Sequence, residues 1–412
     1  MYRIRSFFRR YPVQFWLMFF GLIVSSTGTT MVWPFLTIYA SEKLLLPMAA
    51  VTSLMTFNSV SGFVASVAAG ALVDRFGRKG MMVIGLFGMA VVYLGYIIVA
   101  EFWQFALIMF LAGAFSPLYR VGTDAIVADV IPPEERTQAY SLIRMGRNVG
   151  VALGPILGGL VLSRSYSIGF VTASAALAFF GVITTIFLKE TLQHQPGKPD
   201  ETLRDQFKVI SQALQNKAFS RMLGSFTLME ICATLMWVVL AVYIKQNYGI
   251  VEARFSWIPT TNALMVIFLQ VAITRLTARH SPTKVMPVGA SFYPVAMLLV
   301  ALSSSFWGFL VAMVIMTFGE LITAPTATAY VANLAPPDQR GRYLGFFGLS
   351  WYIALSVGPM SAGFLSDTIS SRAPWYAGAL VGVLAVLSFL SLHRLEIRSE
   401  VKAAIEQTPQ QP

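Results

Sequence analysis

Twelve long apolar stretches follow one another along this chain of 412 residues, with short polar segments between them. An α-helix of about 20 apolar residues spans the hydrocarbon core of a bilayer, so twelve such helices need about 240 buried positions. Hydrophobic residues make up 56% of the chain, which supplies nearly that number. Charged residues make up only 12%, whereas soluble domains carry about a quarter. The sequence therefore predicts an all-α membrane protein and excludes an ordinary soluble enzyme.

Charged residues, prolines and glycines set the boundaries of the twelve predicted transmembrane helices. These helices lie at about 13–40, 48–73, 80–100, 103–130, 138–162, 167–188, 219–245, 255–275, 284–303, 306–332, 341–366 and 374–393. The long polar stretch at 190–217 falls in the middle of the chain. We expect it to be a cytoplasmic linker between an N-terminal six-helix half (1–189) and a C-terminal six-helix half (218–395). A cytoplasmic tail, 396–412, would follow.

The two halves repeat each other at a constant spacing. Gly154-Pro155 recurs 204 residues later as Gly358-Pro359. At the same offset, Trp33 recurs as Trp237, and the segment 132–136 matches 336–340. Several separate matches at one offset indicate a duplication. Because each copy holds an even number of helices, both copies begin on the same side of the membrane.

The net charge of +11 is explained by membrane orientation. Most of the 30 Lys and Arg residues fall on the side of the membrane that carries the N-terminus. The positive-inside rule places that side in the cytoplasm. The few basic residues on the opposite side are Lys43, Arg164, Lys245, Arg254 and Arg372. We therefore expect a multi-pass protein of the cytoplasmic (inner) membrane with both termini in the cytoplasm and no nucleic-acid partner.

The loop after the second predicted helix carries an ordered set of charges, from Gly70 to Gly80. Gly77 allows a tight turn, so that Arg78 can reach a carboxylate on a neighbouring helix, with Asp129 as the candidate. A simpler interpretation treats these cations as positive-inside residues only. The predicted gating latch comprises Asp74, Arg75, Gly77, Arg78, Asp129 and Arg136. The second copy of the loop is degenerate, with Ala278 and Ser281 at the positions of Asp74 and Gly77.

This loop resembles the signature G-x-L-x-D-R-x-G-R-K of the major facilitator superfamily and matches it at every specified position. The resemblance covers about residues 12–395. It implies the major facilitator fold, with twelve helices in two pseudo-symmetric halves. It also implies a substrate site at the interface of the halves, as well as alternating access by a rocker switch.

The fifth predicted helix carries small residues at four-residue spacing, which make one smooth helix face. They are Gly150, Gly154, Pro155, Gly158 and Gly159. Ordinary close helix packing explains such a face. The run is also similar to the fifth-helix motif of bacterial drug:proton antiporters, which favours export. The chain departs from those antiporters at about Leu111, where they often have an arginine.

Four charged residues lie within the predicted helices, where charges are costly and often functional. Arg120 and Asp124 are four residues apart on one helix face, and they form either a self-satisfied pair or a proton or substrate site. Glu230 and Glu320 are candidate proton carriers, because a buried carboxyl group gains a proton readily. Each can instead form a hydrogen bond to a neighbouring helix and never titrate. Ser116 corresponds to Glu320 in the repeat, so the duplicated scaffold does not impose this acid.

A set of aromatic residues near polar or helix-breaking positions forms the candidate substrate cavity, although packing accounts for most aromatic residues of such a chain. They are Trp33, Tyr39, Tyr119, Trp237, Tyr243 and Trp351. Enzyme, nucleotide-binding and C-x-x-C motifs are missing from the sequence, and His194, His280 and His393 are too scattered for a metal site. We expect no enzymatic activity, no cofactor and no metal.

The resemblance to multidrug-type antiporters implies secondary active export of small amphipathic or apolar compounds in exchange for protons. The alternatives are transport of a lysophospholipid, a glycolipid or an endogenous metabolite on the same fold, or a membrane sensor that transports nothing. A sensor needs a signalling domain, and the tail from about His393 is too short for one. The expected partners are a small-molecule substrate, protons and the lipid bilayer, and we expect a monomer.

Overall fold

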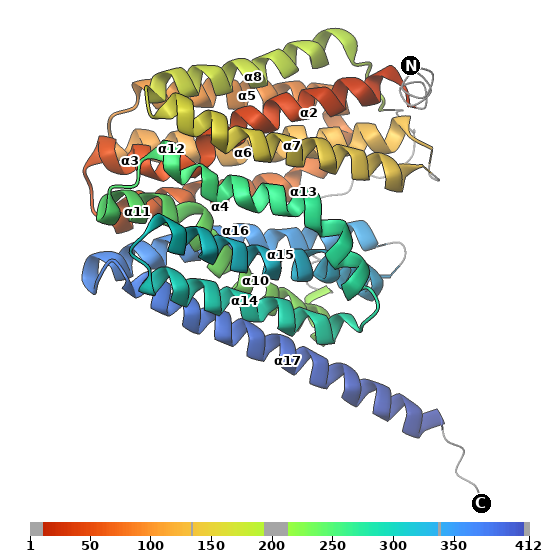
Figure 1. The fold of residues 1–412 in the computed structure, drawn as a ribbon. Helices are drawn as coiled ribbons and strands as arrows, with labels where there is room; N and C mark the ends of the chain where they lie inside the picture. Colours follow the sequence, from red (N-terminus) through yellow and green to blue (C-terminus); the bar gives the residue numbers. More distant parts are fainter. Residues whose placement is uncertain (1–10, 133–134, 193–212, 337–338, 408–412) are drawn as a thin grey trace, which may run out of the picture. The chain divides into compact units, whose positions relative to one another are not determined.

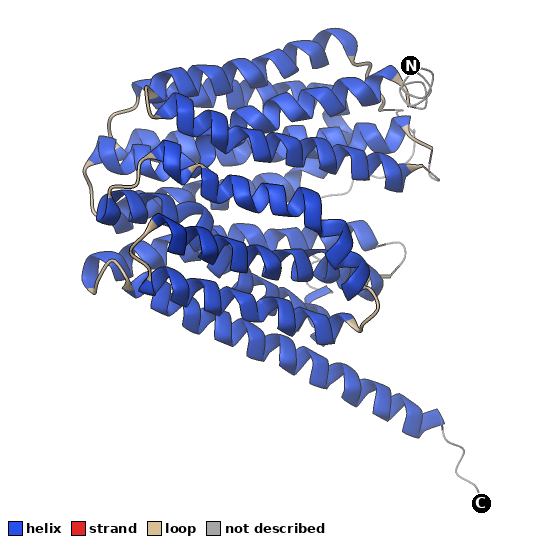
Figure 2. Cartoon of the chain, viewed as in Figure 1, coloured by secondary structure: helices blue, strands red, loops and turns tan. Residues whose placement is uncertain are grey.

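The computed structural model describes residues 11–132, 135–192, 213–336 and 339–407, which form helices joined by short loops, with no strand among them (Figure 2). Within these ranges, twelve helical spans are long and apolar enough to cross a membrane. The predicted fold class is therefore confirmed. The predicted linker 190–217 lies mostly outside the described residues, as do residues 408–412 of the predicted tail.

The first six spans agree with the predicted boundaries to within a few residues. They are α2 (Val13–Val32) continued by η1 (Trp33–Phe35) and α3 (Leu36–Leu44), then α4 (Met48–Phe76), α5 (Arg78–Ile98), α6 (Phe102–Val130), α7 (Arg136–Leu162) and α8 (Tyr166–Phe187).

The remaining spans follow the same pattern. They are α10 (Lys217–Thr234) continued by η2 (Leu235–Val239) and α11 (Leu240–Tyr248), α12 (Glu252–Phe255) with α13 (Trp257–Thr277), α14 (Pro282–Leu302), α15 (Phe306–Leu334), α16 (Arg340–Thr368) and α17 (Ala373–Gln407). The last helix continues past the predicted end at 393, because the segment up to Gln407 has neither glycine nor proline to stop it.

Two spans have an irregular turn at corresponding positions of the repeat. In the first span, Pro34 lacks a backbone N–H, and residues Trp33–Phe35 form a 3₁₀ turn. In the seventh span, residues Leu235–Val239 form a π-helix, a widened turn that is frequent at functional sites. The hydroxyl of Thr37 donates a hydrogen bond of 2.8 Å to the carbonyl of Val238, inside that π-helix.

The chain divides into two compact units. The first comprises Met1–Gln206 and Trp237–Ile267, and the second comprises Phe207–Met236 and Phe268–Pro412. In the first unit, α2 packs along α7 and α8, and α6 packs along α4 and α5 (Figure 1). In the second unit, α14 packs along α15 and α17, and α10 packs against α16 and α17.

Each unit contains the same hydrogen bond between helices. In the first, the Thr30 hydroxyl donates to the carbonyl of Gly150 over 3.0 Å. In the second, the Thr234 hydroxyl donates to the carbonyl of Ala354 over 3.4 Å. Both donors and both acceptors are 204 residues apart. The repeat read from the sequence therefore extends to tertiary contacts.

Candidate functional site

The loop between α4 and α5 holds Arg78 against the end of α6. A guanidinium nitrogen of Arg78 (Nη1) lies 2.7 Å from Asp129 Oδ2, and its Nη2 lies 3.9 Å from Asp74 Oδ1. Gly77 has a φ of +96°, a conformation that favours glycine. The guanidinium of Arg75 lies over the ring of the adjacent Phe76. The structure therefore brings Arg78, Asp129 and Asp74 together and leaves Arg75 exposed in the last turn of α4.

Arg136 takes a different place from the rest of the predicted latch. Its Nε donates a 3.1 Å hydrogen bond to the carbonyl of Ile131, directly after α6 ends. This bond satisfies a carbonyl at a helix end. The residue therefore holds the connection between α6 and α7.

Two residues that follow α8 complete this cluster, and sequence reasoning missed both. The carboxylate of Glu190 accepts hydrogen bonds from the backbone N–H of Arg78, at 3.0 Å, and of Lys79, at 3.1 Å. These are the first residues of α5, where N–H groups lack partners within the helix. The hydroxyl of Thr191 donates to Asp129 Oδ2 over 2.6 Å. The signal in the sequence was an acid three residues after the end of an apolar helix.

The pKa of Glu190 is lowered from its ordinary value by backbone hydrogen bonds. Partial burial acts to raise the pKa of this carboxyl group, but the N–H groups of Leu192, Arg78, Lys79 and Thr191 all donate to it and outweigh that effect. Donors to a carboxylate stabilise its charged form. Glu190 is therefore a charged cap on α5. A Cβ at position 77 would lie 2.6 Å from its Oε2, which gives a second reason for glycine there.

A second charged cluster in the first unit joins α6 and α7. Asp124 Oδ1 lies 3.9 Å from Nη2 of Arg147, and both side chains are partly exposed. The charge of Arg120, one turn from Asp124 on α6, also acts on this carboxylate. Arg120 is exposed. The sequence analysis did not identify Arg147 as a partner of Asp124. The cluster therefore contains more cations than the predicted pair of Arg120 and Asp124.

The two predicted proton carriers lie near each other in the second unit. Glu230 on α10 and Glu320 on α15 lie close enough to interact electrostatically. The buried Tyr293 on α14 lies near both acids. Gly319 allows the close approach of α14, because a Cβ there would lie 2.7 Å from the Gly289 carbonyl oxygen. Both carboxyl groups are partly exposed, and two anionic carboxylates at this proximity repel each other.

The glycine motif of α7 packs against the backbone of α2. A Cβ on Gly154 would lie 2.8 Å from the Met31 nitrogen and 2.9 Å from the Thr27 oxygen. Gly150 and Gly158 meet the backbone of α2 in the same way, and Pro155 is buried beside them. Gly159 faces the side chain of Ser256, between α12 and α13. Each motif residue therefore has a packing role, whatever its part in coupling.

The predicted cavity aromatics divide into two groups. Tyr39 donates a 2.7 Å hydrogen bond to the carbonyl of Tyr96 and packs against Phe170. Tyr243 is buried, and its hydroxyl lies 3.1 Å from that of Tyr248. Both therefore have structural partners. The remaining candidates keep partly exposed side chains, and these are Trp33, Tyr119, Trp237 and Trp351.

An ion-pair cluster that the sequence analysis did not single out ties four spans of the first unit together. Lys245 on α11 pairs with Glu42 on α3 and with Glu252 on α12. The hydroxyl of Tyr166, the first residue of α8, donates to Glu252 over 2.5 Å. The Glu252 residue is only 4% exposed. We call Lys245, Glu42, Glu252 and Tyr166 the lock. It lies at the side predicted to face away from the cytoplasm, opposite the Arg78–Asp129 pair.

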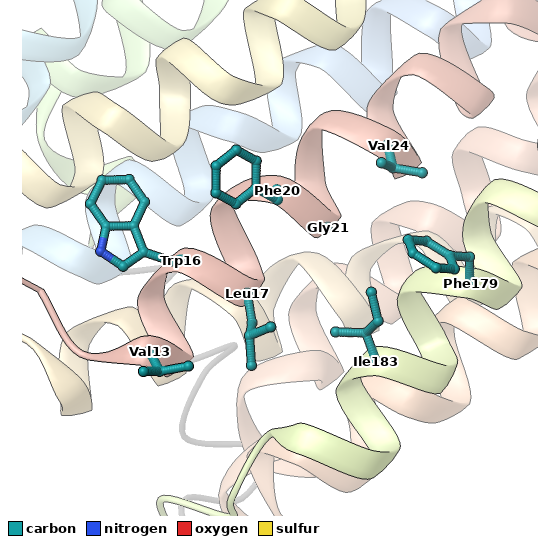
Figure 3. A pocket seen from close by; sticks show the side chains of 8 residues that line it. All are labelled: Val13, Trp16, Leu17, Phe20, Gly21, Val24, Phe179 and Ile183. Atoms are coloured by element: carbon teal, nitrogen blue, oxygen red, sulfur yellow. The ribbon is translucent and has the colours of Figure 1, made fainter. Parts of the chain in front are cut away.

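A polar cluster in the second unit joins Thr283 to His393 over 2.9 Å and to Glu396 over 2.5 Å. A groove of about 240 Å³ between α2 and α8 is lined by apolar side chains such as Leu17, Phe20, Phe179 and Ile183 (Figure 3). No cluster of three or more His, Cys, Asp or Glu residues suited to a metal ion occurs in the described ranges.

The model of the Major Facilitator Superfamily matches residues 18–236 and again residues 222–411. The chain belongs to this superfamily. It is 26% identical to a Na(+), Li(+), K(+)/H(+) antiporter of Planococcus maritimus, over 83% of this chain and 87% of the relative. It is 24% identical to the multidrug resistance protein MdtH of Escherichia coli, over 78% of this chain and 79% of the relative. This major facilitator protein is thus a membrane transporter and not an enzyme.

Solved structures of transporters share the fold. A POT family transporter in complex with 5-aminolevulinic acid superposes with a TM-score of 0.80, at 16% identity, over 94% of this chain and 96% of the other. Identity at this level shows the fold alone. The likeness supports the twelve-helix architecture. The substrate has to be inferred from the chemistry of the site residues.

Proposed function

We propose that this transporter exports small amphipathic or apolar compounds across the cytoplasmic membrane in exchange for protons. The observation that supports this proposal is that Glu230 and Glu320, which lie within membrane spans of the second unit, are near enough to interact electrostatically. Ionised carboxylates are unfavourable in an apolar environment, and two neighbours are more so. The pair can therefore take up a proton from one side of the membrane and release it on the other.

The names of two relatives are consistent with this chemistry. One exchanges alkali cations for protons, and the other is a multidrug resistance protein. The proposed cycle does not need ATP hydrolysis, because the proton gradient supplies the free energy for transport. Each proton crossing with a membrane potential of 100 mV contributes about 2.3 kcal/mol.

The two charged clusters at opposite ends of the first unit suit alternating access. In the proposed cycle, the Arg78–Asp129 pair closes the cytoplasmic side, and the lock of Lys245 and Glu252 closes the outer side. In each state of this cycle, one of these two ion pairs is needed to close its side of the membrane. Both termini would lie in the cytoplasm, and a single copy of the chain contains every residue that the cycle uses.

The test is gradient-driven transport by purified protein in liposomes. We expect Glu320→Gln and Glu230→Gln each to abolish transport driven by an imposed pH gradient. Counterflow of substrate without a gradient should remain, since the glutamine side chain preserves shape. Glu101→Gln, at the exposed start of α6, is the matched control and should transport as the wild type does. Gradient-driven transport by the double variant Glu230→Gln/Glu320→Gln at the wild-type rate would refute the proposal.

A further inference from the structure

A proline in α15 leaves one backbone carbonyl without its usual donor. In an α-helix, a carbonyl accepts a hydrogen bond from the N–H four residues further on, and proline has no N–H. Pro325 lies inside α15, so the carbonyl of Leu321 lacks that donor. Leu321 follows directly after Glu320, one of the two candidate proton carriers. An unsatisfied backbone group within a membrane span is unfavourable, so a partner from another helix is expected.

Gln270 on α13 supplies this partner. Its side-chain Nε2 donates a hydrogen bond of 3.1 Å to the carbonyl of Leu321. The same nitrogen donates to Thr274 Oγ1 over 2.9 Å, one turn further along α13. Both hydrogens of the amide group are therefore engaged. The opposite orientation of this amide would set its oxygen against the carbonyl oxygen of Leu321, so the orientation is fixed.

The part of α13 that carries Gln270 has little other attachment to neighbouring helices. Phe268 is 73% exposed and Val271 is 59% exposed. Among the hydrogen bonds described for residues 268–277, that of Thr277 stays within α13, whereas Gln270 reaches another span. The hydrogen bond of Gln270 is therefore a direct link between this part of α13 and the turn of α15 that ends at Pro325.

Gln270, Glu320 and Pro325 depart from the internal repeat together. At the offset of 204 residues, their counterparts in the first unit are Ser66, Ser116 and Val121. The proline of α6, Pro117, stands four residues before the position that matches Pro325. The amide and the freed carbonyl thus occur in the copy that carries the acid, which a role in placing that acid requires.

We propose that Gln270 is a positioning residue for Glu320. The turn that ends at Pro325 lacks one hydrogen bond and is therefore easily deformed. A donor from α13 to the freed carbonyl holds this turn in one geometry. The part of α15 before this turn carries Glu320, so the bond sets the distance between Glu320 and Glu230, on which their mutual repulsion depends. This inference rests on the proposed function, in which these two acids carry the proton.

Infrared titration of the purified full chain tests this inference without transport. A protonated carboxyl group has a C=O band that a carboxylate lacks, and the part of this band that Glu320→Gln removes reports on Glu320. Gln270→Met has a side chain of the same length without a donor. We expect it to shift the titration midpoint of that band by about half a pH unit or more. Thr261→Val is the control on α13, because the Thr261 hydroxyl donates to the Trp257 carbonyl of the same helix. It should titrate as the wild type does.

Pro325→Ala separates positioning from simple packing. The alanine restores an N–H four residues after Leu321, so the Leu321 carbonyl no longer needs Gln270. Gln270→Met/Pro325→Ala should therefore titrate as Pro325→Ala alone does. If Gln270 only filled space beside α15, Gln270→Met would cause the same shift in both backgrounds.

Two results would overturn the inference: a titration of Gln270→Met equal to that of the wild type, or an equal shift in both backgrounds. If Gln270→Met does not fold, Gln270→Asn takes its place with the same expected results, since its shorter side chain does not reach the Leu321 carbonyl. Failure of the proposed function is seen in a different measurement. Gradient-driven transport by Glu320→Gln at the wild-type rate would refute proton coupling and leave the infrared result on Gln270 intact.

Discussion

Lys245 forms an ion pair with Glu252, a residue that is only 4% exposed and also accepts a hydrogen bond from Tyr166. The same ammonium group contacts Glu42. One cation therefore joins α3, α11 and α12, and Tyr166 brings α8 to the same carboxylate. In the proposed cycle, opening this side would break these bonds, and the energy of the lock would then set part of the barrier.

Removal of Lys245 should destabilise the protein strongly. Lys245→Met leaves the Glu252 carboxylate without its cation, and breaking a buried pair costs about 3–5 kcal/mol. The partial exposure of Lys245 places the expected loss at the lower end of that range. Thermal unfolding in detergent measures it. Lys245→Met/Glu252→Gln should recover part of the loss, and Gln246→Met on the exposed face should cost little. Equal stability of Lys245→Met and the wild type would contradict the role of the lock.

The Arg78–Asp129 contact gives a second prediction. Asp129→Arg places two guanidinium groups where one ion pair of 2.7 Å stood, and we expect transport to fall at least tenfold. The swap Arg78→Asp/Asp129→Arg restores opposite charges and should recover part of the rate. Transport assays in liposomes compare both with Lys284→Gln, which removes a cation elsewhere on the same predicted side. If the swap transports no better than Asp129→Arg, the pairing of these two charges is not what matters.

The contribution of Glu190 to the stability of the folded protein should depend on pH, and the lowered pKa of Glu190 gives the direction of that dependence. Its pKa is lowered in the folded protein, so its contribution to stability is present above its ordinary pKa of about 4.3 and is lost as the pH falls through the lower folded value. The difference in unfolding temperature between the wild type and Glu190→Gln should therefore shrink on acidification below about pH 4. A difference that stays constant with pH would show that the carboxylate charge on α5 contributes nothing.

The glycine face of α7 predicts a steric effect. Gly154→Ala places a Cβ within 3 Å of backbone atoms of Thr27 and Met31, which cannot rotate away. Such overpacking costs about 1–3 kcal/mol. Gly224→Ala in α10 is the control, because its Cβ meets no atom within 4 Å. There the better helix propensity of alanine should stabilise the protein by up to about 1 kcal/mol. Thermal unfolding of both variants checks the prediction, and equal shifts would contradict it.

The parts of this structure that the sequence predicts are those set by local pattern. Apolar length predicts the spans, because a bilayer imposes it. The repeat predicts that Thr30 and Thr234 occupy equivalent places, although not the hydrogen bonds that they make. The turn at Trp33–Phe35 has a local cause in Pro34, whereas the matching π-helix at Leu235–Val239 contains neither proline nor glycine.

Sequence patterns do not predict which charged residues form ion pairs when the residues lie far apart in the chain. Glu42 and Lys245 are far apart in the chain, and each has the appearance of an ordinary loop charge at a helix end. Arg147 lies on α7 and Asp124 lies on α6, so their proximity depends on how these two helices pack. Partners of this kind depend on helix rotation and crossing, which periodicity does not determine.

Coupling of transport to protons is assigned in this proposal to Glu230 and Glu320. It is tested most directly by recording proton release from purified protein, with a pH-sensitive dye in weakly buffered detergent solution, when a transported compound is added. We expect substrate to displace protons from the wild type, and we expect Glu230→Gln/Glu320→Gln to bind the same compound without releasing any. Equal proton release by the wild type and the double variant would contradict it.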